Sequence, residues 1–167
     1  MRLLIVRHAI AVPHRTPDVP EDQRPLTPRG EKRFRVAARG LARICRRPDV
    51  LLSSPLVRAR QTADIAAEAW GEVEVTESDA LAGGSFEKIA TAVEKYADQK
   101  LVAIFGHEPD VSTVVARLLD TSDSERLTFK KGGAAPLDVP ANMADGGALI
   151  WYAPPRLLRA VAGDDED

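Results

Sequence analysis

The stretch Leu3-Leu4-Ile5-Val6-Arg7-His8 opens the chain and contains the pattern on which the fold depends. Its first four residues form a continuous apolar run, which is typical of a strand buried on both faces of a parallel sheet. An arginine and a histidine follow without a break. Such polar residues either mark the point where a strand leaves the core or belong to a functional site, and the rest of the chain must distinguish these two possibilities.

Segments with strand character and helix character alternate after this run. We expect strands near 3–6, 49–53, 73–75, 101–105, 127–129, 134–139 and 149–152. We expect helices near 28–45, 54–69, 86–97 and 111–119. Thr27 followed by Pro28 is typical of a helix N-cap with proline at the first helical position. This order predicts an α/β fold around a central, mostly parallel sheet.

Length and composition narrow the class of protein. The 167 residues, 44% hydrophobic and 29% charged, suit one globular domain, expected over 1–162, with an acidic tail at 163–167 that we expect to be disordered. No apolar run is long enough to span a membrane, and the net charge of −2 disfavours a dedicated nucleic-acid binder. The single cysteine, Cys45, excludes an internal disulfide and a cysteine-based metal site, so we expect a cytoplasmic protein.

Polar residues also follow two other expected strands. Arg58 and Arg60 lie in the first turns of the helix after 49–53, and His107 and Glu108 follow 101–105. Because the carboxyl ends of parallel strands meet at one edge of the sheet, we expect the three sets to converge and to bring together two histidines and one or two arginines. Arginines repel a metal ion but bind phosphoryl oxygens through their planar forks. The set therefore predicts a phosphate site without a metal.

Four segments in order carry a family resemblance: Arg7-His8-Ala9, RPLTPRGEKRF at 24–34, LLSSPLVRARQTA at 51–63 and LVAIFGHEPDVS at 101–112. They resemble the histidine phosphatase superfamily and, within it, the small phosphohistidine phosphatases of the SixA type. Ala9 stands where the common Arg-His-Gly signature has glycine. The resemblance covers nearly the whole chain and implies a three-layer α/β/α fold of the phosphoglycerate mutase-like kind.

The resemblance also implies a mechanism. His8 would attack phosphorus and form a phosphohistidine intermediate, while Arg7, Arg58 and His107 would bind the phosphoryl oxygens, without cofactor or metal. Glu108 is a further candidate for substrate contact. We expect Arg60 to form a surface salt bridge, because it lies further round the helix than Arg58.

The segment after the third strand bears on the substrate. Many members of the family place a general acid there, whereas this chain has Ala82-Gly83-Gly84 at the matching place. A missing acid favours phosphohistidine, because imidazole is a better leaving group than an alkoxide. The expected partner is then a phosphorylated protein, for which a histidine phosphotransfer domain is a candidate. The arginine-rich helix 29–47 is a candidate docking surface for it.

Other functions remain open at this point. A phosphatase for a small phosphoester would need an acid, for which Glu108 and Glu87 are the candidates. The short chain and the doubtful acid disfavour a mutase, and a module that only binds phosphate would not need His8. A nucleotide-binding domain is disfavoured because the chain has neither GxGxxG nor GxxxxGK[ST].

Overall fold

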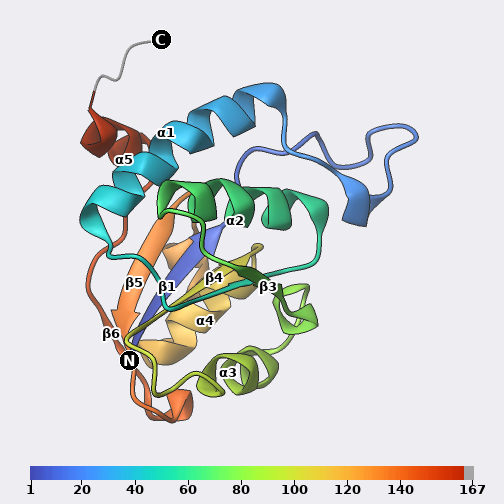
Figure 1. The fold of residues 1–167 in the computed structure, drawn as a ribbon. Coiled ribbons are helices and arrows are strands. Elements are labelled where there is room, and N and C mark those ends of the chain that lie inside the picture. The colour runs from blue at the N-terminus through green and yellow to red at the C-terminus, as the bar shows by residue number, and fades with distance from the viewer. Residues whose placement is uncertain (164–167) are drawn as a thin grey trace.

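A mixed six-stranded sheet forms the centre of the molecule in the computed structural model, which describes residues 1–163 (Figure 1). Its strands are β1 (Arg2–Arg7), β2 (Val50–Ser53), β3 (Val75–Glu77), β4 (Leu101–Gly106), β5 (Ala134–Asp138) and β6 (Ala148–Leu149). They lie in the order β3-β2-β4-β1-β5-β6, in which β5 is antiparallel to both of its neighbours and all other pairs are parallel. Except for Gly163, the expected tail 163–167 lies outside the described residues.

Five helices cover the two faces of the sheet. They are α1 (Pro28–Ile44), α2 (Val57–Ala69), α3 (Phe86–Glu94), α4 (Asp110–Leu118) and α5 (Pro155–Ala162). Figure 1 shows α1, α2 and α5 on one face and α3 and α4 on the other, which confirms the expected three layers. No helix within residues 1–163 is long and apolar enough to cross a bilayer.

The apolar run of β1 is buried from both sides, as its sequence predicts. Leu4 and Val6 belong to the core beneath α1 and α2, whereas Leu3 and Ile5 belong to the core beneath α3 and α4. This alternation follows from the two-residue period of a strand, which sends successive side chains to opposite faces. Parallel pairing of β1 with β4 and antiparallel pairing with β5 place β1 in the interior of the sheet.

The start of α1 is built as the sequence predicts and lies close to the end of β1. The Thr27 hydroxyl oxygen accepts a hydrogen bond from the Gly30 amide at 2.9 Å, which caps the helix. A Cβ atom on Gly30 would lie only 2.1 Å from the carbonyl oxygen of Ile10. A glycine is therefore required where α1 passes the segment that follows β1.

The C-terminal third departs from expectation. The strand predicted at 127–129 is wrong: Ser124–Leu127 is a 3₁₀ helix, and the Phe129 amide binds the Glu108 carboxylate instead of a neighbouring strand. The strand predicted at 149–152 is replaced by the shorter β6, which shares only Leu149 with it. Beyond β6, the Ile150 amide donates to the Pro136 carbonyl at 3.0 Å, and an isolated bridge joins Ala134 and Ala153. Helix α5 was not predicted, although Pro155 at its first turn is a typical start signal.

Candidate active site

The carboxyl ends of β1, β4 and β2 are neighbours in the sheet, as the sequence predicts. The His8 amide donates to the Gly106 carbonyl at 2.9 Å, joining the ends of β1 and β4. The Ser54 amide donates to the Phe105 carbonyl at 3.0 Å, joining the ends of β2 and β4. β4 lies between β2 and β1, both of which precede it in the chain, so the strand order changes direction here. α/β folds form their ligand sites at the carboxyl ends of the strands beside such a switch point.

His8 is held as a neutral imidazole with a defined tautomer. Its ring is buried, and Nδ1 donates to the Ala9 carbonyl oxygen at 2.7 Å. Because a carbonyl can only accept, Nδ1 carries the proton and Nε2 carries the free lone pair. Burial, with smaller contributions from His107 and from the positive charges of Arg58 and Arg7, lowers the His8 pKa to about 3. Nε2 of His8 therefore has an unprotonated lone pair at neutral pH.

The His107 ring packs beside that of His8. The two ring centroids lie 5.1 Å apart with an interplanar angle of 50°. His107 Nε2 shares a hydrogen bond of 2.8 Å with the hydroxyl of Ser54, which leaves Nδ1 as its other polar atom. Burial, followed by the charge of Arg58, lowers the His107 pKa to about 4.

Arg7 is positioned by the segment 127–129, for which the sequence predicts a strand. Its Nη1 donates to the Phe129 carbonyl at 2.5 Å. The Phe129 amide in turn donates to Glu108 Oε1 at 2.6 Å, and Ser112 Oγ donates to the other oxygen, Oε2. Glu108, next to His107 in the chain, thus anchors the backbone to which the guanidinium of Arg7 is bound.

Arg58 enters the site from the first turn of α2 and is held by residues that the sequence did not single out. Its Nη1 donates to the Glu21 carbonyl at 2.8 Å, and its Nη2 lies 3.4 Å from Glu21 Oε1. Arg24 holds the same carboxylate, with Nε donating to Oε2 at 2.8 Å. Its guanidinium lowers the Glu21 pKa to about 2, so that carboxylate remains charged. Arg24 is the first residue of the family motif RPLTPRGEKRF, and this motif was the sequence feature that could have indicated its role.

Three buried nitrogen atoms distinguish this site from the rest of the protein. Across residues 1–163, the buried side-chain polar atoms that lack a hydrogen-bond partner are Arg7 Nε, Arg58 Nε and His107 Nδ1. Buried polar atoms are nearly always paired, because an unpaired one costs about 1–3 kcal/mol. All three belong to residues predicted to bind phosphoryl oxygens, which are acceptors of the kind these atoms require.

The two candidate general acids, Glu108 and Glu87, are not placed as proton donors. Both carboxylate oxygens of Glu108 accept hydrogen bonds from the protein. Glu87 is exposed on α3 and lines a separate hollow with residues 78–80 and 82–84. The amide at the start of α3 lowers the Glu87 pKa, opposite to what a proton donor needs. Asp110, which sequence reasoning missed, accepts from the Gly83 amide at 3.0 Å and has a pKa raised by burial. Asp110 thereby positions the segment 82–84, which matches the place of the general acid in many family members.

Arg60 on α2 and two arginines of α1 form contacts away from this site. Arg60 pairs with Asp64 at 2.9 Å and Glu77 at 2.8 Å, which confirms the expected surface salt bridge. On α1, Arg35 pairs with Glu31 and Glu68, and Arg43 donates to the Val161 and Ala162 carbonyls at the end of α5. Helix α1 is therefore not a uniform basic surface, since part of its charge supports the packing of neighbouring helices.

Comparison with known proteins places this geometry in a family. The family model of the histidine phosphatase superfamily (branch 1) matches residues 3–110. The chain is 36% identical over 138 residues to an uncharacterised protein of Picosynechococcus sp., covering 80% of this chain and 82% of the relative.

Two solved structures share the fold over nearly their full length. A structure of the protein histidine phosphatase SixA in complex with tungstate superposes with a TM-score of 0.80 at 22% identity, covering 95% of this chain and 99% of the other. A protein of Nakamurella multipartitia described as a phosphohistidine phosphatase SixA gives 0.74 at 28% identity, covering 92% and 95%. These superpositions confirm the expected phosphoglycerate mutase-like architecture. The segment that the family model matches, residues 3–110, contains His8, Arg58 and His107. The chain belongs to the histidine phosphatase superfamily.

Proposed function

We propose that this protein is a phosphohistidine phosphatase of the SixA type, which removes a phosphoryl group from a histidine on another protein. The observation that carries the proposal is the pairing of a neutral His8, with Nε2 unprotonated, and three buried unpartnered nitrogens on Arg7, Arg58 and His107. A nucleophile surrounded by donors is what phosphoryl transfer requires, because the protein contributes mainly positioning and charge stabilisation.

In the first step His8 Nε2 attacks phosphorus, and the bond between phosphorus and the substrate imidazole breaks. The phosphoryl group is then covalently bound to His8, and the released imidazole takes a proton from water. Arg7 and Arg58 donate to the phosphoryl oxygens and balance the negative charge that the transition state distributes over them. With the Ser54 hydroxyl donating to Nε2, His107 keeps its proton on Nδ1 and supplies a further donor.

In the second step water attacks the phosphorus of the intermediate, and the bond to His8 Nε2 breaks to release inorganic phosphate. His8 returns to the same tautomer, because Ala9 accepts the Nδ1 proton throughout. The Ala9 amide also donates to Thr62 Oγ1 at 3.0 Å, and that hydroxyl donates to the Arg58 carbonyl at 2.6 Å. Thr62 thus links the backbone next to His8, the proposed nucleophile, to the backbone of Arg58, which would bind the phosphoryl group.

The choice of phosphohistidine over a phosphoester rests on the surroundings of the leaving group. Ala82, Gly83 and Gly84 supply no carboxyl group, and Glu87 is ionised and exposed. The Glu108 carboxylate is bound by the Phe129 amide, and the Asp110 carboxylate accepts from the Gly83 amide. An imidazole needs less protonation on departure than an alkoxide, so such a site suits it better. The tungstate held by the related SixA protein is a tetrahedral oxyanion like phosphate, which supports an oxyanion pocket in this fold.

The test is paired hydrolysis kinetics on a protein carrying phosphohistidine and on an aryl phosphate. We expect a strong preference for phosphohistidine and loss of both activities in His8→Ala. A chelator should leave the rates unchanged. Substantial activity in His8→Ala would remove His8 as nucleophile, and equal or better rates on the aryl ester would favour a small-molecule phosphatase. An activity lost to chelator and restored by a divalent ion would contradict the proposed chemistry.

A further inference from the structure

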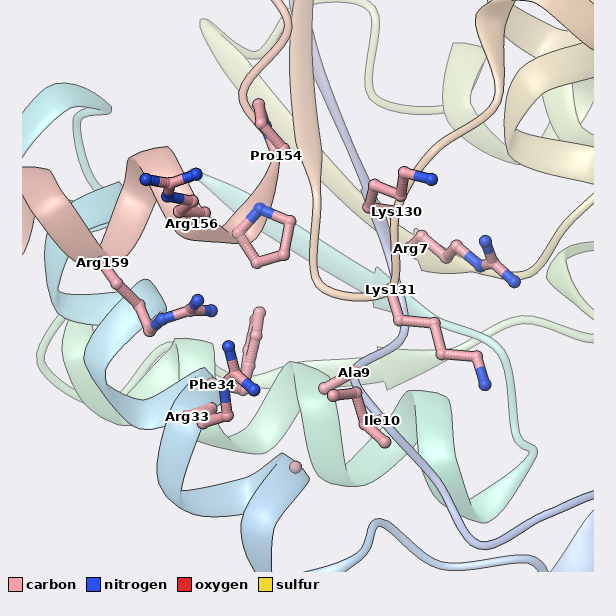
Figure 2. Close-up of a pocket in the computed structure, with 12 residues that line it drawn as sticks. Arg7, Ala9, Ile10, Arg33, Phe34, Lys130, Lys131, Pro154, Arg156 and Arg159 are labelled. Atoms are coloured by element: carbon pink, nitrogen blue, oxygen red, sulfur yellow. The ribbon is translucent and has the colours of Figure 1, made fainter.

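A basic cavity opens beside the phosphate site, between the start of α1, the start of α5 and the loop at 130–131. Its volume is about 490 Å³, within the usual range for ligand sites. Six cationic side chains line it, and no carboxylate does: Arg7, Arg33, Lys130, Lys131, Arg156 and Arg159. Figure 2 shows Arg33, Arg156 and Arg159 on one side and Arg7 and Lys131 on the other, with Phe34 between them.

The charge of this cavity is not neutralised from within the described protein. Among residues 1–163, none of the five cationic residues other than Arg7 forms an ion pair with a carboxylate. Burial and then the neighbouring charges of Arg33 and Arg156 lower the Arg159 pKa, and burial and then Arg7 lower that of Lys131. Like charges this close repel one another, so an anion with several charges would stabilise the arrangement.

Arg7 connects the cavity to the phosphate site, because it lines the cavity and also carries one of the unpartnered nitrogens. The cavity therefore adjoins the site at His8 through Arg7 and extends from there to Arg156 and Arg159. Its apolar wall, formed by Phe34 and Pro155 among others, suits the backbone and methylene groups of a peptide. The distal arginines suit carboxylates, which they bind through their planar forks.

We propose that this cavity binds an acidic segment flanking the phosphohistidine of the protein substrate, and so selects acidic target sites. The inference rests on the proposed function and defines its substrate class. It also places the docking surface at the cavity rather than along the whole of helix 29–47, because α1 contributes Arg33 to it while Arg35 and Arg43 are bound elsewhere.

The test uses two synthetic peptides with a central, chemically phosphorylated histidine. They differ only in the flanking residues, which are glutamate in one and glutamine in the other. The enzyme variants are Arg156→Gln combined with Arg159→Gln, and Arg33→Gln as an independent change on a different helix. The matched control combines Arg46→Gln with Lys100→Gln, which removes two charges from a hollow at the opposite, amino-terminal edge of the parallel strands.

We expect the wild type to hydrolyse the acidic peptide with a kcat/KM about tenfold above that of the neutral one, mainly through KM. The α5 variant should lose most of this preference, Arg33→Gln part of it, and the control none. The neutral peptide reports in each variant whether the active site is intact. Added salt should reduce the preference, because the contacts are partly exposed.

Two results would overturn the inference and leave the proposed function standing. One is His8-dependent hydrolysis of both peptides by the wild type at equal rates. The other is a preference that survives in both cavity variants. If neither peptide is hydrolysed in a manner that depends on His8, the proposed function fails and this inference fails with it.

Discussion

Nδ1 of His8 donates a hydrogen bond to the carbonyl oxygen of its own neighbour, Ala9, at 2.7 Å. The tautomer of His8, the proposed nucleophile, is therefore set by the backbone of the next residue and not by a distant carboxylate. This contact does not depend on the side chain of residue 9, where alanine replaces the glycine of the common signature. Ala9 is buried and its amide is held by Thr62, so the acceptor is fixed in place.

Activity should persist well below the pH at which an ordinary histidine becomes charged. The pKa values of His8 and His107 are lowered from 6.5 to about 3 and about 4. Both rings are thus neutral at pH 6, and protonation removes the lone pair of His8 only in stronger acid. We expect the acid limb of kcat/KM for an aryl phosphate to lie near pH 4. A limb at pH 6 to 7 would show that His8 has an ordinary pKa.

Stability should fall as the pH is lowered from 6.5 toward 4. In this window the unfolded chain binds protons at His8 and His107, whereas the folded chain does not, so acid favours unfolding. Each histidine contributes a slope of about 1.4 kcal/mol per pH unit to the free energy of unfolding. Urea unfolding at several pH values measures this slope, and His8→Gln should reduce it. An unchanged slope in His8→Gln would contradict the lowered pKa.

Arg58→Lys should lower kcat/KM by roughly a hundredfold, because a lysine cannot keep the contact with Glu21 and still present a planar fork to phosphate. The matched control is Arg60→Lys, two positions further along α2 and paired with Asp64 and Glu77 at the surface. It should change the rate by less than about twofold. Similar losses in the two variants would show that Arg58 acts through the stability of α2 and not through the substrate.

Glu108→Gln separates a positioning role from acid catalysis. Glutamine keeps an oxygen for the Phe129 amide and an amide group for Ser112, so Arg7 stays in place and kcat/KM should fall by less than about threefold. Glu108→Ala removes both contacts and should lower kcat/KM by about tenfold or more. If Glu108 were the general acid, glutamine and alanine would both lower the rate by about 10² or more, most strongly for substrates with poor leaving groups.

Much of the fold was predictable because it depends on local patterns. The buried run of β1 and the cap of α1 at Thr27 are written in consecutive residues. The convergence of His8, Arg58 and His107 was predictable as well, since the carboxyl ends of parallel strands meet at one edge. The conformation of the segment at 127–129 was not predictable, because the Phe129 amide is bound to Glu108, a residue 21 positions away in the chain.

The sequence by itself determined the order of strands and helices and the candidate residues at their ends, because periodicity, capping and strand termination are properties of neighbouring residues. Only the tertiary structure decided which atoms of those residues are held and which are left for a ligand. Glu21 meets Arg58 across 37 positions, and Arg7 meets Phe129 across 122. The basic cavity likewise combines α1, α5 and the loop at 130–131. Such contacts depend on how side chains from separate elements pack together, which no local pattern specifies.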